Sequence, residues 1–466
     1  MGLDNPKAVY FALDNLPTGI FATYDQALER IEAQPPQIHA RAKQVLMWIS
    51  CTMRPMTVNE LQHALAIELD ATRLDRDVDT TRLDRAAIPV KSGLTSGCAG
   101  LVVIDRQSQV IRLVHETAQS YLEERRSCLF PRAQEYIARS CLIYLSFDTF
   151  DTGPCSLPEI KKRLQDNAFL NYAALYWGNH VDERVGLNTR ALALKFLKDD
   201  QKVSCASQVM MYGRDGYSFI HSAQGMSSLH VCSYFGLKAL LEDVLGQSNA
   251  VDVRDNKRRT PLCYAAEFGH EAVVKLLLDK GAAADLESYQ QWTPGLLAVR
   301  NGHVAVLKLL LDGGSSLISR DGGAKALFMA AENGREAVIE LLLDVGADVH
   351  SKNSRGATPL WVAAEKKHDG VIRLLLDERF VTWGPEFPIH VITLTGSKKT
   401  FYILPGTTCL ELKKMIEDVE GILPQMQYLF SNTWIPEATI LSERSIRQHS
   451  TIRVLLPIWE FRYTQR

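Results

Sequence analysis

The chain has 466 residues, with 52 basic and 54 acidic side chains and a formal net charge of −2. This length exceeds what one hydrophobic core usually serves, so two to four structural units are expected. The balanced charge excludes a global basic field, and we therefore expect neither nucleic acid nor an anionic membrane as a partner. No uncharged apolar run reaches the roughly 18 residues of a membrane-spanning helix, and the amino terminus lacks the pattern of a secretory signal.

The nine cysteines are scattered through the chain and never form a Cys-x-x-Cys pair. An odd number without paired spacing predicts reduced thiols and argues against both a disulfide framework and a zinc site. We accordingly expect a cytoplasmic protein, with the nucleus as a second possible location, that binds no metal and no cofactor.

Residues 16–67 predict helices. Apolar side chains recur at helical spacing from Tyr24 to Ile31, and a second apolar face begins at Ala42. Thr57, followed three residues later by Glu60, has the pattern of a capping box that begins a further helix.

Residues 70–85 hold mixed charges in which Thr-Arg-Leu-Asp-Arg occurs twice, which favours a solvated connection. Residues 100–105 and 110–115 then alternate like two strands joined by a polar turn, and residues 116–124 predict a helix. Helices combined with a strand hairpin predict a winged-helix-like module.

A second set of residues in this region forms a recognisable pattern: Leu16-Pro17, Tyr24-Asp25, Leu28, Ile31, Trp48, Arg54-Pro55, Glu60-Leu61, Gly100-Leu101-Val102, His115 and Tyr121-Leu122. With these residues the region resembles the part of fungal NACHT proteins that follows their nucleotide-binding core, and residues 133–145 and 169–180 resemble their helical connector. The resemblance covers about residues 10–215. It implies a relation to signal-transducing ATPases, which commonly carry ankyrin repeats.

The chain lacks the Gly-rich loop ending in Gly-Lys-Ser/Thr that holds nucleotide phosphates in this family. Residues 91–97 have their lysine on the wrong side of the loop. His115-Glu116 begins like a zinc-protease helix, but Gln119 stands where the second histidine is required. We therefore expect no enzymatic activity and no catalytic residue, with the ATPase half either lost or encoded separately.

Residues 227–377 repeat one pattern five times. The glycines Gly236, Gly269, Gly302 and Gly334 lie 33, 33 and 32 residues apart, which is typical of stacked repeats. Thr-Pro begins three of the units at a helix start, the glycine ends the first helix, and a leucine-rich second helix faces the stack. The pattern resembles the ankyrin repeat, in which no unit is stable alone.

The family's histidine after Thr-Pro-Leu occurs here only as His230, and the apolar residues at this position in later repeats predict apolar packing between repeats. They are Cys263, Leu296, Phe328 and Trp361. Side chains of each first helix that stacking does not need are predicted to form a concave surface for a protein partner. These are Tyr264, Glu267, Phe268, Leu297, Arg300, Asn301, Met329, Glu332, Asn333, Val362, Glu365 and Lys366. Loop tips add Arg254, Lys257, Tyr289, Trp292, Arg320, Lys352 and Arg355.

Beyond the repeats, the pattern predicts two strands, a helix and further strands between residues 387 and 456. The segments Thr393-Leu394-Thr395-Gly396 and His449-Ser450-Thr451-Ile452 resemble the corresponding segments of ubiquitin. The chain continues to Arg466 without a terminal Gly-Gly, so conjugation is not expected. The resemblance implies a recognition patch on the sheet formed by Leu394, Phe430, Arg453 and Leu455. The open alternative is that Phe430 belongs to the core or is covered by the repeats.

The sequence thus predicts a multidomain, mainly α-helical chain with a carboxyl-terminal α+β domain. Its expected parts are a winged-helix-like module at 1–130, a helical connector at 131–222, ankyrin repeats at 223–380, a ubiquitin-like domain at 387–456 and a tail at 457–466. The favoured function is a non-enzymatic adaptor, whose partners are a protein on the repeats and ubiquitin receptors or proteasome-linked factors on the terminal domain. Two alternatives remain open: the regulatory half of a signalling ATPase, and an accessory subunit in ubiquitin ligation.

Overall fold

The computed structural model describes residues 19–67, 82–181, 186–215, 225–246, 250–318, 320–353, 356–376, 387–392, 398–403, 407–420, 428–431, 433–434 and 451–455. The chain divides into two compact units, which are described separately. The first contains Met1–Ala265, Lys275–Ala283 and Glu287–Gln290. The second contains Ala266–Val274, Ala284–Leu286 and Gln291–Arg466. Within the described residues, no helix combines the length and apolarity needed to cross a bilayer.

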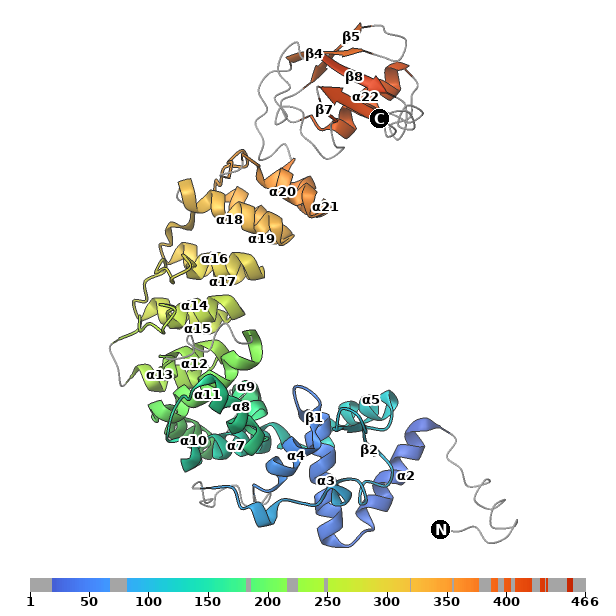
Figure 1. Cartoon of the computed structure of the whole chain (residues 1–466), viewed down its shortest axis with the longest axis vertical. Helices are drawn as coiled ribbons and strands as arrows, with labels where there is room; N and C mark the ends of the chain where they lie inside the picture. The colour runs from blue at the N-terminus through green and yellow to red at the C-terminus, as the bar shows by residue number, and fades with distance from the viewer. Residues whose placement is uncertain are drawn as a thin grey trace, which may run out of the picture. The chain divides into compact units, whose positions relative to one another are not determined.

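The first unit begins with helices that pack around a small antiparallel sheet in the order β1-β3-β2 (Figure 1). Strand β3 pairs with both of its neighbours, so Ile111 lies opposite Met56 on one side and Ile104 on the other. The predicted winged-helix arrangement is confirmed. Its elements are α2 (Ile20–Glu32), α3 (Pro36–Cys51), β1 (Met56–Thr57), α4 (Val58–Leu65), β2 (Val102–Ile104), β3 (Val110–Leu113) and α5 (Glu116–Glu124).

The predicted capping box begins α4. Thr57 Oγ1 accepts from the Glu60 main-chain N–H at 3.3 Å, and Glu60 Oε2 accepts from the Thr57 N–H at 2.8 Å. Arg54 pairs with the other carboxylate oxygen at 2.6 Å. Glu60 is buried, and these bonds satisfy its charge where water is excluded.

The helical connector is built around α7, in which every residue from Tyr136 to Leu145 is buried. Helix α3 packs against it, and Trp48 meets the ring of Phe169 edge to face with centroids 5.5 Å apart. The connector elements are α6 (Arg126–Leu129), α7 (Ala133–Leu145), η3 (Asp148–Phe150), α8 (Leu157–Asp166), α9 (Leu170–Tyr176), η4 (Trp177–His180), α10 (Leu187–Leu197) and α11 (Asp200–Asp215).

A chain of hydrogen bonds also joins the winged-helix elements to the connector. The Met53 N–H donates to the hydroxyl of Tyr172 at 3.0 Å, and Tyr172 contacts Nε2 of His180 at 2.8 Å. Nδ1 of His180 contacts Oε1 of Gln134 at 2.5 Å. The amide oxygen accepts only, so Nδ1 carries the proton and Nε2 accepts from the tyrosine.

The connector covers the outer side of the first repeat. Trp177 meets Phe235 with ring centroids 5.3 Å apart, and Arg190 pairs with Asp243 at 2.7 Å. Gly178 leaves room for this contact, because a Cβ there would lie 2.2 Å from the Phe235 ring. Stacked repeats need such a cover on their terminal faces.

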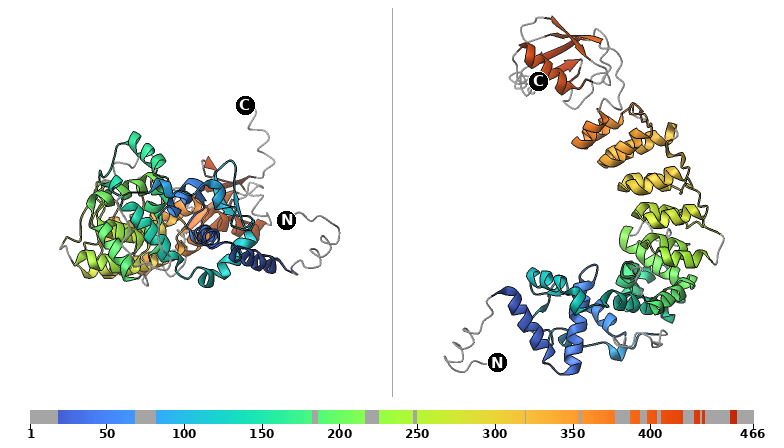
Figure 2. Two further views of the ribbon diagram at one scale, coloured as in Figure 1. Left: turned by 90° about the horizontal axis from the view of Figure 1, so that it is seen from below. Right: turned by 180° about the vertical axis from the view of Figure 1, so that it is seen from behind.

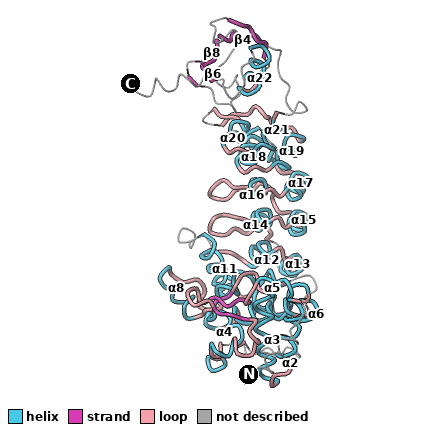
Figure 3. Tube along the Cα trace, turned by 90° about the vertical axis from the view of Figure 1, so that its right-hand side faces the viewer, coloured by secondary structure: helices cyan, strands magenta, loops and turns pink. Residues whose placement is uncertain are grey.

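Each repeat is a pair of short antiparallel helices. In the second unit, the first helices α16, α18 and α20 form one layer and the second helices α17, α19 and α21 form another (Figure 3). The helices are α12 (Ser228–Phe235), α13 (Lys238–Leu245), α14 (Pro261–Phe268), α15 (Glu271–Asp279), α16 (Pro294–Asn301), α17 (Val304–Asp312), α18 (Arg320–Glu332), α19 (Glu336–Asp344), α20 (Pro359–Glu365) and α21 (Asp369–Leu375).

The expected start and stop signals of these helices are confirmed. Thr293 and Thr358 each accept at Oγ1 from a main-chain N–H three residues on, at 3.2 and 3.3 Å. Gly236 and Gly302 end their helices with φ of 75° and 86°, in the left-handed region that favours glycine. The leucine-rich helices are packed inside the stack, where Leu277, Leu310 and Leu342 have no exposed surface.

Two expectations for the later repeats are wrong. Arg320 is not a loop tip, because it begins α18, which is a turn longer than the other first helices. Lys325-Ala326 occupies the position at which Thr-Pro begins the first helix in three other repeats, so no N-cap residue starts the helix at that point. Trp361 is not packed between repeats but 40% exposed. The equivalent His230 contacts Arg259 of the following repeat, whereas Trp361 belongs to the last repeat that the structure describes.

The carboxyl-terminal part of the second unit is a mixed five-stranded sheet in the order β5-β4-β8-β6-β7, with one helix packed on it (Figures 1 and 2). The central pair β4 and β8 is parallel, and the other pairs are antiparallel. Ile389, Leu412 and Ile452 are fully buried between sheet and helix. The elements are β4 (Phe387–Ile392), β5 (Lys398–Ile403), α22 (Cys409–Glu420), β6 (Tyr428–Ser431), β7 (Thr433–Trp434) and β8 (Thr451–Leu455).

Candidate functional site

The predicted concave-face residues of the repeats differ in their exposure. Arg300, Glu332, Asn333, Glu365 and Lys366 are exposed. Four others are half-buried: Phe268, Asn301, Met329 and Val362. These nine positions lie on or at the ends of the first helices and present mixed polar and apolar groups to solvent, as a protein-binding surface does.

Three predicted surface residues are buried, so the prediction is wrong for them. Leu297 has no exposed surface, and Tyr264 is 1% exposed with its hydroxyl donating to Asp255 Oδ2 at 2.7 Å. Glu267 is 9% exposed, and its main-chain oxygen accepts from His303 at 3.0 Å. Helical periodicity alone could not separate these positions from exposed ones, because tertiary contacts such as the one between Tyr264 and Asp255 do not appear in the periodicity.

The side chain that directly precedes α17, α19 and α21 joins neighbouring repeats. Nε2 of His303 contacts the main-chain oxygen of Glu267, Arg335 Nε donates to that of Arg300 at 3.1 Å, and His368 Nε2 contacts that of Glu332 at 3.1 Å. Each bond satisfies a carbonyl at the end of the preceding repeat's first helix. The signal in the sequence is a histidine or arginine at the repeat period just before the second helix, which reasoning from sequence missed.

Within the first unit, the loop of residues 254–259, called here the first finger loop, is built on a buried carboxylate. Asp255 is 3% exposed, and its Oδ1 accepts from the Lys257 and Arg259 main-chain N–H groups at 2.9 and 2.8 Å. Residues 287–290 form the second finger loop, in which the Tyr289 N–H donates to the Lys257 carbonyl at 3.0 Å. The bond between Tyr289 and Lys257 joins the two finger loops.

Aromatic rings and guanidinium groups meet at the loops. In the first unit, Arg258 lies over the ring of Tyr289 at 5.6 Å, and 70% of Tyr289 is exposed. In the second unit, Arg300 lies over the ring of Trp292 at 5.4 Å. Tyrosine, tryptophan and arginine are the residues that most often dominate binding energy at protein interfaces.

The predicted patch on the terminal sheet is only partly described. Leu394 lies outside the described residues. Phe430 pairs with Arg453 across β6 and β8, and Leu455 pairs with Tyr428. Their neighbours in sequence, Leu429 and Ile452, are fully buried.

The cysteines and histidines considered for chemistry have structural roles. All nine cysteines are free, and burial raises the pKa of the Cys232 and Cys263 thiols, which disfavours the reactive thiolate. His115 caps α5, because its Nδ1 accepts from the Thr117 N–H at 3.1 Å. Within the described ranges, no group of three histidine, cysteine or acidic side chains could hold a metal ion.

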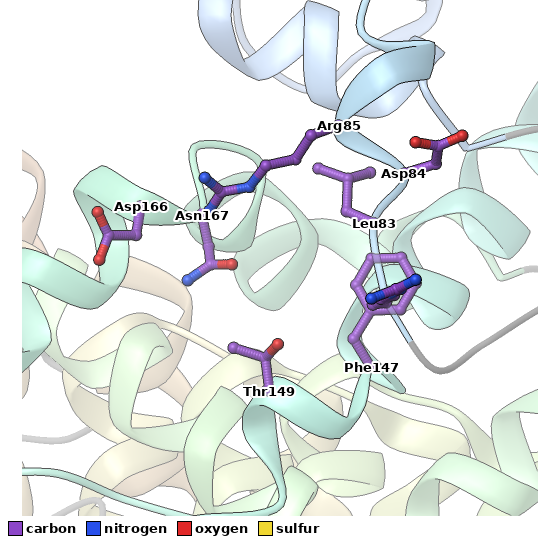
Figure 4. A pocket seen from close by; sticks show the side chains of 8 residues that line it. Leu83, Asp84, Arg85, Phe147, Thr149, Asp166 and Asn167 are labelled. Atoms are coloured by element: carbon purple, nitrogen blue, oxygen red, sulfur yellow. The ribbon is translucent and has the colours of Figure 1, made fainter.

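Among the described residues of the first unit are two hollows that the sequence did not predict. One, of about 570 Å³, lies between the segment before η1 (Arg85–Ala87), the loop around η3 and the end of α8 (Figure 4). Figure 4 shows the Arg85 side chain extending toward Asn167, with Thr149 below them. Two arginines and two aspartates line it, so it favours neither sign of charge. Its lining residues are Arg82, Leu83, Asp84, Arg85, Phe147, Thr149, Asp166 and Asn167.

The second hollow, of about 430 Å³, is mainly apolar and lies between α3 and the start of α7. Met47, Phe130 and Tyr136 contribute to its wall, with Lys43 and Arg132 at its edge. Asp84 and Asp166 lie in the lining of the first hollow, and His39 lies beside Lys43 and Tyr136 in the lining of the second.

Comparison with known proteins agrees with the two-helix repeats. Residues 229–321 and 316–382 match the family model of ankyrin repeats in three copies. Residues 229–382 are ankyrin repeats. Residues 30–130 match the model of the winged helix domain of GPI inositol-deacylase, in agreement with the helices and hairpin described above.

A curated relative is the azaphilone pigments biosynthesis cluster protein L of Monascus ruber. It is 26% identical over 230 residues, which cover 45% of this chain and 45% of that protein. The chain thus matches less than half of its relative's length. Ankyrin repeats act in protein–protein interaction, and the winged helix domain is of the type associated with NACHT proteins.

Proposed function

We propose that the chain is a non-enzymatic adaptor whose ankyrin repeats bind a protein partner and whose terminal domain is a ubiquitin-like fold that docks on ubiquitin receptors or proteasome-linked factors. The observation that carries the first part is the exposed row of Arg300, Glu332 and Lys366 on successive first helices. A rigid array that presents charged and apolar groups at a fixed spacing is suited to a folded partner, because the array loses little conformational entropy on binding.

The terminal sheet supports the second part of the proposal. Its strand order β5-β4-β8-β6-β7, with a parallel central pair and one helix on the sheet, is compatible with a β-grasp fold like that of ubiquitin and supports this half of the proposal. The patch positions Phe430, Arg453 and Leu455 alternate with the buried Leu429 and Ile452. We place this adaptor in the cytoplasm or nucleus.

The test is affinity purification of the full chain from its own cells with two sets of variants. Reversing charge at Arg300 and Lys366 should remove the partner of the repeats, whereas reversal at the exposed Lys308 on α17 should not. Replacing Leu394, Phe430 and Leu455 together by alanine should remove ubiquitin-system proteins alone. Unchanged recovery with either set rejects the corresponding half of the proposal.

The winged helix domain favours a second candidate, the regulatory half of a NACHT-type signalling ATPase. In that case the repeats would sense a ligand protein and transmit its binding to a nucleotide-binding core. Titration of the isolated full chain with fluorescent ATP separates the two candidates. The adaptor proposal expects no binding, and saturable binding would favour the ATPase relation.

A further inference from the structure

We propose that the two finger loops of the first unit bind an acidic segment of the partner protein, through the guanidinium groups of Arg254 and Arg258 and the ring of Tyr289. This inference rests on the proposed protein-binding function of the repeats and specifies the chemistry of the partner. It depends on exposure, charge and backbone conformation within one compact unit.

The charge of the first finger loop is strongly one-sided. Residues 254–259 read Arg-Asp-Asn-Lys-Arg-Arg, and the single carboxylate, on Asp255, is buried and engaged by main-chain donors. Arg254 and Arg258 are exposed, and no carboxylate of a described residue pairs with either. Arg259 has an internal role, since it lies over the ring of Tyr264 at 5.1 Å.

Asp252 and Glu287 reduce this excess of positive charge but do not cancel it, because residues 254–259 carry four basic side chains and one carboxylate. Asp252 accepts from the Ala283 N–H at 3.1 Å, so its carboxylate is already engaged. Glu287 is exposed at the start of the second finger loop. Exposed guanidinium groups that no carboxylate engages favour carboxylates as ligands, which they bind through two parallel N–H donors.

The backbone at Arg258 adds an independent argument. Its φ is +59°, in the left-handed region that favours glycine, and the equivalent position in the last described repeat is Gly356 with φ +76°. Both loops are otherwise closed alike, because Asn353 Oδ1 accepts from the Ala357 N–H at 3.0 Å as Asp255 Oδ1 accepts from Arg259. The loop geometry thus accommodates glycine at this position, and Arg258 adopts the same left-handed conformation at a cost in backbone strain.

The aromatic ring supplies the apolar part of the surface. Tyr289 is 70% exposed, an unusual state for so large a side chain, and Arg258 lies over one face of the ring. The bond from the Tyr289 N–H to the Lys257 carbonyl fixes the ring beside the basic loop. A pre-ordered tyrosine between arginines loses little entropy on binding a peptide.

The experiment measures fluorescence anisotropy of a labelled (Glu-Asp-Gly)₄ peptide with the full chain at low salt. The controls are the neutral isostere (Gln-Asn-Gly)₄ and a thymidine oligonucleotide of equal length. We expect the acidic peptide to bind, the neutral one to bind at least about tenfold more weakly, and affinity to fall with added salt. Equal binding of both peptides, or tighter binding of the oligonucleotide, overturns the inference.

Variants then locate the site. Arg258→Gly keeps the loop conformation and should weaken acidic-peptide binding at least about fivefold. Arg258→Glu and Arg254→Glu should weaken this binding further, because they add negative charge. Tyr289→Ala should also weaken it. Lys275→Glu is the matched charge control, since Lys275 is exposed on α15 away from the loops. The inference is overturned if Arg258→Gly and Arg258→Glu bind the acidic peptide with wild-type affinity. It is also overturned if Lys275→Glu weakens peptide binding as much as the loop variants do. The acidic peptide could fail to bind while the Arg300 and Lys366 variants still lose the partner in the affinity purification. In that case this inference fails and the adaptor function stands.

Discussion

The imidazole of His303 lies against Gly269 of the preceding repeat and contacts the main-chain oxygen of Glu267 through Nε2 at 3.0 Å. A Cβ at Gly269 would lie 2.6 Å from His303 Nδ1. The glycine therefore has two roles: it adopts the left-handed φ of +77° that ends α14, and it leaves space for the next repeat's histidine.

Gly269→Ala should separate these two roles when compared with Gly281→Ala. Gly281 has a similar φ of +85°, but no atom lies within 4 Å of a Cβ built there. Both variants pay backbone strain of about 1 kcal/mol, and Gly269→Ala should cost roughly 1–3 kcal/mol more because His303 must move. Urea unfolding of the two variants measures the difference. Equal losses would show that His303 adjusts freely.

The stability of the first unit should fall in mild acid. Burial lowers the pKa of His180 to about 4 from an ordinary value of 6.5, and it also lowers the pKa of His63 and His230. The unfolded chain then binds protons that the folded chain excludes, so stability is complete above pH 6.5 and is lost as pH falls toward 4. A shift of this size at His180 corresponds to roughly 3 kcal/mol.

Urea unfolding at pH 7.5 and pH 5 measures this dependence. His180→Gln retains a donor and an acceptor but cannot titrate, so it should show a smaller loss between the two pH values, with the remainder due to His63 and His230. A variant as acid-sensitive as the wild type would exclude His180 as a contributor.

Gln291 has a φ of +57°, the same left-handed conformation as Arg258. Replacing it by glycine should stabilise the chain by roughly 0.5–1 kcal/mol, since glycine adopts this conformation without strain. Gln290→Gly is the control, because the adjacent residue lacks a positive φ and glycine there only increases the freedom of the unfolded chain. The melting temperatures of the two variants, compared with that of the wild type, measure this difference. A lower melting temperature for Gln291→Gly would contradict the strain argument.

The junction between the connector and the first repeat should be sensitive to a single methyl group. Gly178→Ala places a Cβ 2.2 Å from Phe235, in a contact that also includes Trp177. We expect a loss of roughly 1–3 kcal/mol. Gly246→Ala is the matched control, because its Cβ meets main-chain atoms at an ordinary 3.5 Å. If both variants unfold at the same urea concentration as the wild type, the connector does not stabilise the repeats through this contact.

The sequence allowed the local structure to be predicted where one residue type has one physical role. Thr57 with Glu60 marked a helix start, and the glycines at 236, 269, 302 and 334 marked helix ends, because few other residues satisfy those positions. Helix α5 runs from Glu116 to Glu124 as predicted. The repeat period then determined the fold of the central third.

Exposure was much harder to predict. Tyr264 and Arg300 lie only three positions apart in the repeat pattern, yet Tyr264 is buried and bonded to Asp255, a contact that no periodicity contains. Trp361 looked like a core residue because its equivalents in earlier repeats are covered by the following repeat. The His303 contact joins residues 36 positions apart and becomes visible only when repeats are stacked.

Chemical cross-linking of the purified complex is the most direct test that the first-helix side of the repeats is where the partner binds. A lysine-reactive reagent followed by mass spectrometry should join the partner to Lys257 and Lys366, which lie on a finger loop and at the end of a first helix. Lys275 and Lys308 are exposed on second helices and should remain unlinked. Cross-links concentrated on Lys275 and Lys308, with none on Lys257 or Lys366, would contradict the account.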